Sequence, residues 1–562
     1  MTADLNPAPA KPVPGKRSAV PDSSPQQNSL LWGPLLALGL AAFLVEVPFF
    51  FFGIPSGHDV EFHTYSWLDI LAQWKHGMFY PRWAAWAHFG YGEPRFVFYP
   101  PASWILGGLI SLIFPWTLAT SVYIWIALVA AGASMFLLAR CWLDRRGATF
   151  AAVLYAVNPY HLVIVYWRSA FAELLAACLI PLLLLFVLEA AEGRRRIVAL
   201  GFVLAAAWLT NAPAAVMIHY SLGLLILFFA WRQRSPRLLL VGAAAVALGA
   251  SLAAFYLLPA IYEQKWVTIS QALAQGSRPQ DNFLFIHTTD PDHDAFNHVI
   301  SYVAVLEMAL IALSFAAGKL WRRKDEFANA ALLWAAASSV LMFPITLFLW
   351  DILPKMRFMQ FPWRWLLCLS MIFAIVLAIG VRRWPWRAAG CILSLLVLVG
   401  AWHRIQEPWW DNAADLREMQ DNMSDRIGYE GTDEYTPRGA KPSAINKDAR
   451  NVTVDGPARA AIRVQQWNAE SKTFTAEMSA PDQLALRLFP YPAWKTEVNG
   501  NVVQTGTRPG TGQMLVPVEA GMNRVQITFV RTWDRSAGGW VSVITALGLI
   551  GWTVRRKRAR AA

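Results

Sequence analysis

The sequence predicts a polytopic α-helical membrane protein with about 12 spans and an extracytoplasmic β-sandwich domain near its C-terminus. Of its 562 residues, 56% are hydrophobic and 15% are charged, against about 25% charged residues in soluble domains. Basic clusters separate long apolar runs, and from Asn451 onward apolar and polar residues alternate as they do in half-buried strands. This composition excludes a soluble globular enzyme and a disordered chain.

The N-terminal segment carries a tail and a first span. Residues 1–29 are rich in Pro, Ser, Ala and Asn and are expected to form a disordered cytoplasmic tail. The apolar run 30–52 is too long for the core of a signal peptide and lacks a clear small-residue cleavage site. We therefore interpret it as a retained first span.

The basic clusters predict the topology, because basic loops stay on the cytoplasmic side of a membrane. If the N-terminus is inside, an even number of crossings separates each cluster from the next. The run 102–114 is short for a span and fits a re-entrant or interfacial helix. Both termini are then cytoplasmic, and the predicted parts are a membrane domain (30–403) with outside loops 54–101 and 259–297, an outside domain (404–536), and a last span with a basic tail (537–562).

The outside domain has two parts. Residues 404–450 are polar and show little periodicity, whereas five later runs alternate with period two: 459–467, 472–478, 483–489, 494–503 and 524–530. Asn499-Gly500 predicts a type I′ hairpin turn, which needs positive φ at both central residues. We expect an antiparallel sandwich from about residue 451, a module that binds or supports more often than it catalyses.

The first outside loop contains the candidate catalytic residues. Asp59 and Glu61 lie two residues apart just beyond the first span, flanked by His58 and His63. Such carboxylates could act as a general base or hold a cation. Alternatively, they are ordinary solvated residues at the end of a span. The stretch 65–74 has helical apolar spacing and predicts a helix lying in the interface.

Two histidines (His58 and His63), four arginines and one glutamate are candidate substrate-binding residues. Arg82 belongs to the first outside loop, Arg168 and Glu173 separate two apolar runs, and Arg357 and Arg364 flank the start of a later run. At a membrane boundary, guanidinium groups can hold phosphate oxygens in a bidentate manner. They are equally suited to anchoring a helix at the interface.

The loop 259–297 is the candidate cation site. It contains His287, Asp290, Asp292, His293 and Asp294, which could bind a divalent cation, but their spacing matches no known metal motif. A flexible solvated loop and a lid are the alternatives. The chain has no P-loop, Rossmann glycine pattern or nucleophile elbow, and no basic helix suited to nucleic acid, so we expect no nucleic-acid partner.

The arrangement resembles the GT-C superfamily of integral-membrane glycosyltransferases. It is closer still to a group of bacterial membrane proteins described as 6-pyruvoyl-tetrahydropterin-synthase-related. The similarity is carried by six strings, Gly57–Asp59, Phe98–Pro101, Tyr155–His161, Arg168 with Glu173, Phe361–Arg364 and Gly428–Tyr435. The group's label refers to the reaction of a small soluble zinc enzyme, whose metal ligands this sequence does not supply.

The GT-C resemblance implies a function. Such enzymes take a sugar from a polyprenyl-phosphate or polyprenyl-pyrophosphate carrier and pass it to an acceptor on the outer face of a membrane, here a bacterial cytoplasmic membrane and an envelope glycan or lipid. It implies that Asp59, or second Glu61, acts as base or orients the acceptor hydroxyl. The Asp-Val-Glu spacing departs from the adjacent acidic pair that is common in the superfamily, so this assignment stays open. A transporter of lipid-linked glycans and a non-catalytic assembly protein are the alternative functions.

Overall fold

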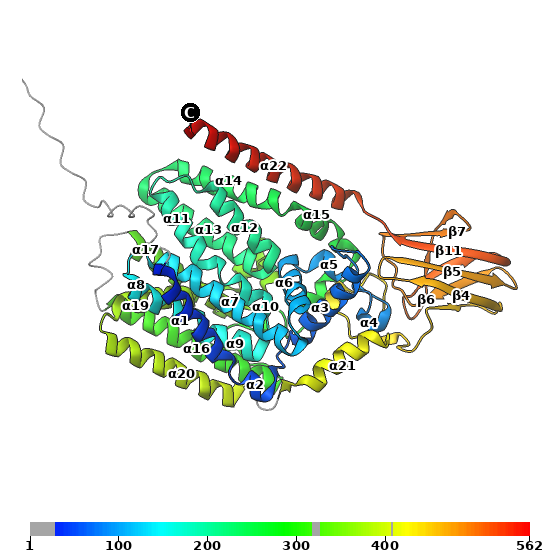
Figure 1. Ribbon diagram of the computed structural model, residues 1–562, viewed down its shortest axis with the longest axis horizontal. Helices are drawn as coiled ribbons and strands as arrows, with labels where there is room; N and C mark the ends of the chain where they lie inside the picture. The colour runs from blue at the N-terminus through cyan, green and yellow to red at the C-terminus, as the bar shows by residue number, and fades with distance from the viewer. Residues whose placement is uncertain (1–28, 317–325, 406–408, 562) are drawn as a thin grey trace, which may run out of the picture.

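The computed structural model describes residues 29–316, 326–405 and 409–561. Helices pack side by side into a bundle, and the β-strands form a separate layered body at one end of it (Figure 1). The predicted tail lies outside the described residues, apart from Ser29, which begins the first helix. The basic cluster between residues 319 and 324 also lies outside them.

The bundle consists of helices of membrane-spanning length. Within the described residues, eight helices are long and apolar enough to cross a membrane, and two bent pairs raise this number to ten. The eight comprise α1 (Ser29–Glu46) with α2 (Phe49–Phe52), α7 (Trp116–Ala139), α8 (Arg145–Ala156) with α9 (Pro159–Val163) and η2 (Ile164–Arg168), α10 (Phe171–Ala176) with α11 (Leu179–Ala191), α13 (Ala212–Gln233), α16 (Pro291–Ala316), η8 (Pro362–Trp365) with α19 (Leu366–Gly380), and α22 (Trp533–Ala561). The bent pairs are α14 (Pro236–Leu252) with α15 (Ala254–Glu263), and α17 (Glu326–Val340) with η6 (Pro344–Thr346) and α18 (Leu347–Ile352).

Two further helices account for the difference from the predicted twelve spans. α12 (Ile197–Thr210) has 14 residues, fewer than the ~20 that a hydrocarbon core of ordinary thickness requires. α20 (Trp384–Ile405) has 22 residues and covers the other predicted span. The short run after Pro100 forms α6 (Pro101–Ile113), a 13-residue helix, as its length predicts.

The two ends of the bundle differ in charge. The backbone of Gly33, near the start of α1, faces the Arg145 guanidinium, and that of Gly147 faces Arg387. These arginines therefore share one end. At the other end, β1 (Ile54–Pro55) pairs antiparallel with β2 (Trp410–Asp411). This segregation is the arrangement that the positive-inside rule describes.

The C-terminal strands form two facing antiparallel sheets with a common core. Phe474 and Ile527 of one sheet and Leu486 and Val516 of the other are fully buried in one hydrophobic cluster. The four-stranded sheet has the order β3 (Val452–Val454), β6 (Asp482–Leu486), β10 (Met514–Val518), β9 (Gly506–Thr507), and the five-stranded sheet β4 (Ala460–Trp467), β5 (Ser471–Met478), β11 (Gly521–Phe529), β7 (Trp494–Val498), β8 (Asn501–Val503). Each of the five predicted runs falls on strands of these two sheets: 483–489 on β6 of the four-stranded sheet, and the other four on the five-stranded sheet, where 494–503 covers both β7 and β8.

The predicted hairpin turn is confirmed. Asn499 and Gly500 have φ values of 52° and 84°, and Val498 pairs directly with Asn501 across the turn. Positive φ at both central positions is the requirement of a type I′ turn.

The segment before the sandwich contains a helix that was not predicted, because the segment shows little apparent periodicity. α21 (Ala413–Ser424) buries Leu416, Met419 and Met423 and begins with a capping box between Asn412 and Asp415. The apolar residues recur every three or four positions, which is the helical signal. Charged residues on the exposed face outnumber these apolar residues, so the composition of the segment is polar.

A buried ionic network joins the first outside loop to the segment before the sandwich. In α5 (Arg95–Phe98), Arg95 donates from Nε to Glu93 at 2.6 Å and from Nη2 to the Thr432 hydroxyl at 3.1 Å. Glu93 also accepts from the Thr432 backbone N–H at 2.7 Å and pairs with His88 at 3.0 Å. Although burial opposes ionisation, Arg95 and His88 lower the pKa of Glu93 to about 2. The loop and residues 428–436 therefore form one rigid outer layer.

Candidate functional site

The first outside loop is held against a break in a membrane helix. The π-helix η2 ends at Arg168, and Ser169 follows in a left-handed conformation with φ 48°. The Asp59 backbone N–H donates to the Arg168 carbonyl at 2.9 Å, and the Ser169 hydroxyl donates to the Pro55 carbonyl at 3.0 Å. These bonds place Asp59, which caps α3 (Val60–Lys75), beside the arginine at the helix break. π-Helical segments are frequent at functional sites.

Gly57 makes this close approach possible. A Cβ at residue 57 would lie 2.5 Å from Ser169 Oγ and 2.6 Å from the Trp167 carbonyl oxygen. We expect Gly57→Ala to push the loop away from the break and to cost about 1–3 kcal/mol of folding free energy, the usual range for overpacking. Thermal unfolding of purified protein measures this, with Gly506→Ala as a control, because a Cβ at residue 506 comes no closer than 3.5 Å to Leu515. Wild-type stability of Gly57→Ala would contradict the close packing.

A buried carboxylate organises the polar groups beneath the loop. Glu173 accepts from Arg168 Nη1 at 2.6 Å and from Arg364 Nε at 3.0 Å. The Tyr160 hydroxyl donates to its other oxygen. All three charged side chains are less than a tenth exposed. A buried charge is stable only when it is paired and hydrogen-bonded, and Glu173 meets this condition with two guanidinium groups.

Asp59 completes the cluster from the solvent side. Its carboxylate lies 3.9 Å from Arg168 Nη2, and its side chain is 41% exposed. Two guanidinium groups face one buried carboxylate, so Asp59 is the counter-charge on the open side. Among the described residues, Nη2 of Arg168 and Nη2 of Arg364 have no hydrogen-bond acceptor. The cluster can therefore hold an anionic oxygen next to a solvent-accessible carboxylate.

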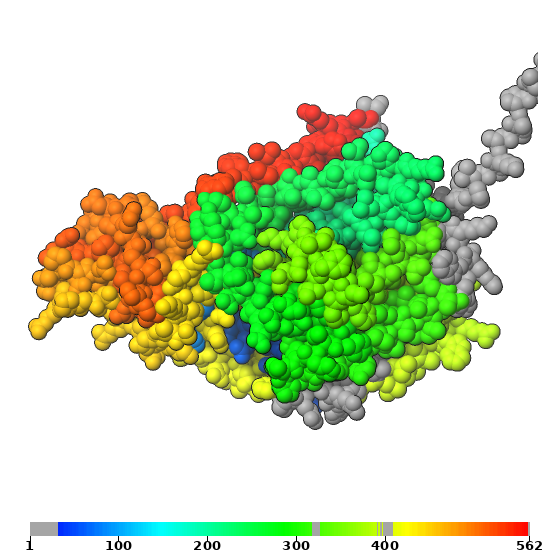
Figure 2. Space-filling model, turned by 180° about the vertical axis from the view of Figure 1, so that it is seen from behind, coloured from blue at the N-terminus to red at the C-terminus, as the bar shows by residue number. Residues whose placement is uncertain are grey.

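Aromatic rings frame the cluster and bring a third helix to it. Phe361 and Trp363 stack at 4.8 Å, and Arg168 lies 4.8 Å from the Trp363 ring centroid. Phe296 of α16 packs 4.9 Å from Trp167 and 6.4 Å from His58. Figure 2 shows N-terminal residues, in blue, at the floor of a hollow between green and yellow segments.

Two predicted residues of α3 make no bond to the arginines of the cluster. Glu61 is exposed, and its charge adds to that of Asp415 around Asp411, whose pKa is raised to about 6, chiefly by burial. His63 is buried and stacks on Phe171 at 4.9 Å. Among the described residues, no hydrogen bond or ion pair joins Glu61 or His63 to Arg168, although both are neighbours of Asp59 in sequence.

Two predicted arginines lie elsewhere. Arg82 stacks over the Tyr80 ring at 4.3 Å, and its backbone N–H donates to Glu470 of the sandwich at 2.9 Å. Arg357 pairs with Asp351 at 3.3 Å. Of the predicted set, Asp59, Arg168, Glu173 and Arg364 meet in one cluster, with His58 at its edge. Sequence reasoning assigned no role to Tyr160 or Phe296, although Tyr160 belongs to the string Tyr155–His161.

His63 is expected to make the free energy of unfolding depend on pH. Burial lowers its pKa from 6.5 to about 4, so the unfolded chain binds a proton between these pH values and the folded chain does not. The difference in pKa contributes about 3 kcal/mol to the free energy of unfolding. This contribution is present above pH 6.5 and is lost as the pH falls to 4. We expect His63→Gln to weaken the fall in unfolding temperature between pH 7 and 4.5, and exposed His76→Gln to leave it unchanged. Identical pH profiles for wild type and His63→Gln would contradict this.

The loop 259–297 is folded and carries a different His/Asp cluster from the predicted one. Donor atoms of His287, Asp294 and His298 lie within 4.8 Å of one another, whereas His293 contacts Asn282 at 2.9 Å. Two imidazoles and a carboxylate are suitable ligands for a divalent cation. His298 Nδ1 also lies 2.8 Å from the Asp294 backbone carbonyl, so with this bond kept His298 would ligate through Nε2.

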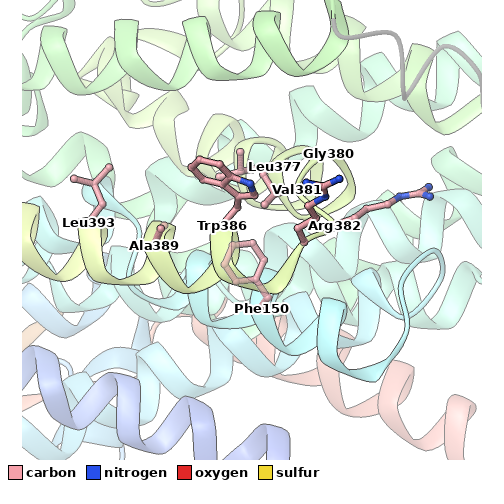
Figure 3. A pocket seen from close by; sticks show the side chains of 10 residues that line it. Phe150, Leu377, Gly380, Val381, Arg382, Trp386, Ala389 and Leu393 are labelled. Atoms are coloured by element: carbon pink, nitrogen blue, oxygen red, sulfur yellow. The ribbon is translucent and has the colours of Figure 1, made fainter.

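A cavity of about 710 Å³ lies at the basic end of the bundle. Figure 3 shows it between α19 and α20, lined by Phe150, Leu377, Trp386 and Leu393, with Arg382 at its rim. Asp59 and Arg168 do not line this cavity, which separates it from the cluster described above.

The chain was compared with known proteins. No curated protein matches it. Two solved structures of the oligosaccharyltransferase of Archaeoglobus fulgidus are similar, each with 16% identity over 71% of this chain. The apo form has a TM-score of 0.39 and 56% of its chain covered, and the complex with Zn and sulfate has 0.37 and 53%. The chain thus spans about half the length of that protein.

A family model matches residues 96–406, more than half of the chain. This range contains Arg168, Glu173 and Arg364 and four of the six strings that suggested the resemblance. The model describes a 6-pyruvoyl-tetrahydropterin synthase related domain of membrane proteins. The chain belongs to this family of 6-pyruvoyl-tetrahydropterin-synthase-related membrane proteins.

Proposed function

We propose that the chain is a membrane glycosyltransferase that moves a sugar from a polyprenyl-phosphate-type carrier to an envelope acceptor on the extracytoplasmic face. The observation that carries this proposal is the meeting of Asp59 with Arg168 and Arg364 at the outer ends of membrane helices. A lipid carrier enters sideways between helices, so its phosphate reaches the protein where hydrocarbon meets water. Cations are needed at that depth, and a base is needed beside them.

The proposed transfer reaction follows from the positions of the arginines, Glu173 and Asp59 relative to one another. The free Nη2 atoms of Arg168 and Arg364 hold the phosphate, and Glu173 fixes both guanidinium groups from below. Asp59 accepts the proton of the acceptor hydroxyl as its oxygen bonds to the anomeric carbon. The bond from that carbon to the phosphate oxygen breaks, and the carrier phosphate leaves with the electron pair. Its growing negative charge is stabilised by the two arginines.

The basic end of the bundle supports the proposed orientation. The sandwich and Asp59 lie at the opposite end from Arg145 and Arg387, so the cluster faces the extracytoplasmic side if the basic end is cytoplasmic. The membrane in question is then the bacterial cytoplasmic membrane, with both termini inside.

A transporter of lipid-linked glycans is the second candidate, and one observation favours it. Glu307, inside α16, is buried and accepts from the Ser370 hydroxyl at 2.9 Å with both oxygens. An ionisable group inside a span is a functional candidate, because insertion of its charge is costly. Glu307 and Ser370 lie on the same two spans that bring Phe296 and Arg364 to the Asp59 cluster.

Reconstitution distinguishes these functions. The full chain is placed in liposomes with lipid-linked saccharides and acceptor material extracted from cells that lack it, and the products are analysed by mass spectrometry. A transferase forms a new glycosidic bond and releases the carrier phosphate. A transporter moves the intact lipid-linked saccharide between leaflets without a new bond, and an assembly protein does neither. Absence of a new bond in extracts that support transfer by wild-type membranes would refute the proposal.

A further inference from the structure

A polar cleft of about 490 Å³ lies where α3 ends against the edge of the five-stranded sheet. Gln73 and His76 come from α3, Trp86 comes from the following loop, and residues 466–472 come from the end of β4, the start of β5 and the turn between them. In Figure 1 this is the junction between α3, α4 (Ala87–Gly90) and the strands. The volume lies in the range of about 300–1,000 Å³ that is usual for small-molecule sites.

Three charged residues of the cleft are already occupied by the protein. Asp69 accepts from Gln73 at 2.9 Å and from the Tyr429 hydroxyl at 3.1 Å. Arg487 donates to five backbone carbonyl oxygens, and Lys472 donates to two. These three groups hold the walls of the cleft together, so they offer little to an ionic ligand. Arg426 also lines the cleft, and its exposed side chain makes no hydrogen bond or ion pair among the described residues.

The neutral polar groups are free. Gln73 uses its Nε2 for bonds within the wall, but its Oε1 has no partner although the residue is only 4% exposed. No bond is made by the side-chain amides of Asn451, Gln466 and Asn468 within the part of the chain that the structure describes. Because Gln73 Oε1 is itself closed to solvent, the amides of Asn451, Gln466 and Asn468 are the neutral groups that can bond the hydroxyls of a ligand.

Two half-buried indoles complete the lining. Trp86 and Trp467 both line the cleft, one from the first outside loop and one from the sandwich. Indole rings present flat apolar surfaces with a polar edge. A pyranose ring has apolar C–H faces and hydroxyl groups around its rim, and amides can both donate to and accept from hydroxyls. The lining therefore matches a saccharide in both respects.

We propose that this cleft binds a neutral saccharide. The 16-residue helix α3 is about 24 Å long and runs from Asp59 at its start to the cleft at its end. A glycan of several rings can therefore occupy the cleft while one of its hydroxyls lies near Asp59. That the ligand is the remote part of the acceptor rests on the transferase function proposed above, whereas saccharide binding in the cleft does not.

Binding is tested with the full chain in detergent on an array of neutral oligosaccharides, and positive ligands are measured by isothermal titration calorimetry. Uronic-acid oligosaccharides and neutral peptides are probed in parallel. We expect neutral oligosaccharides of two or more rings to bind and the other two classes not to. Binding of no neutral oligosaccharide, or a preference for anionic saccharides or peptides, overturns the proposal.

Variants locate the binding. Gln466→Ala combined with Asn468→Ala removes two side chains without internal bonds, and we expect roughly tenfold weaker binding. Trp467→Ala removes the stacking surface and is expected to weaken binding at least as much. Gln465→Ala is the matched control, because its side chain bonds Thr475 and lies outside the cleft. Unchanged affinity of the double variant, with unchanged thermal stability, refutes the location.

The same measurements separate this proposal from the transferase. If the cleft variants lose binding but reconstituted wild type forms no glycosidic bond, the cleft proposal stands and the transferase fails. If transfer occurs and the array shows no saccharide binding, the transferase proposal stands and the cleft proposal fails.

Discussion

Asp59→Asn is expected to lower the rate of sugar transfer by about 10²–10⁴-fold, the usual contribution of a positioned general base. Asparagine keeps the shape of the side chain, and the Asp59 side chain makes no capping bond to α3 that could be lost, so the fold and the donor contacts of Arg168 and Arg364 remain. What is lost is the ability to accept the proton of the acceptor hydroxyl. The effect should therefore fall on the rate at saturating donor, with little change in donor affinity. Single-turnover transfer in liposomes measures it.

Two carboxylate variants accompany this experiment. Glu418→Gln changes an exposed carboxylate of α21 and is expected to leave transfer unchanged. Glu61→Gln compares the two predicted catalytic acids directly, and its exposed position away from Arg168 favours a small effect. Wild-type transfer by Asp59→Asn would remove Asp59 from the mechanism. A severe loss in Glu61→Gln alone would assign the proton transfer to Glu61 instead.

Glu173→Gln is expected to lower the free energy of unfolding by about 3–5 kcal/mol, because it leaves two buried guanidinium groups without their shared counter-charge. The carboxylate accepts hydrogen bonds from Arg168, Arg364 and Tyr160, so one substitution weakens the contact between three segments. Chemical or thermal unfolding in detergent is the measurement. Donor affinity should fall as well, because both arginines lose the group that fixes them.

A control and a rescue separate this effect from a general loss of charge. Glu189 pairs with Arg194 and Arg196 at 2.6 Å on the partly exposed surface, and Glu189→Gln should cost at most about 1 kcal/mol. In Glu173→Gln with Arg364→Gln, one uncompensated cation is gone, so we expect part of the stability to return. A double variant that is less stable than Glu173→Gln would contradict a charge imbalance as the cause.

Most of the fold could be predicted because hydropathy and alternation are local properties. The spans follow from apolar runs between basic clusters, and the strands follow from period-two patterns such as 472–478. The helix α21 was missed because only Leu416, Met419 and Met423 mark its buried face. In a segment dominated by charges, that pattern is weaker than the overall polarity.

The candidate site could be predicted only in part, because it depends on contacts between distant segments. Nothing local in the sequence shows that Glu173 is shared by Arg168 and Arg364, which are separated from each other by 196 positions (364 − 168). Nor does it show that α3 turns Glu61 away from Asp59, or that Arg82 packs beneath the sandwich. The cleft was not predicted at all, because its walls come from residues near 73 and near 467.

The network of Glu93, Arg95 and Thr432 has a consequence for biosynthesis. Arg95 and Thr432 are 337 positions apart. At about 5–20 residues per second, roughly 20–70 seconds therefore pass between the synthesis of the first outside loop and that of Thr432. During that interval the loop crosses the translocon without the Thr432 bonds to Glu93 and Arg95. Nascent chains should therefore become resistant to protease at this loop only after the segment around residue 432 has been exported.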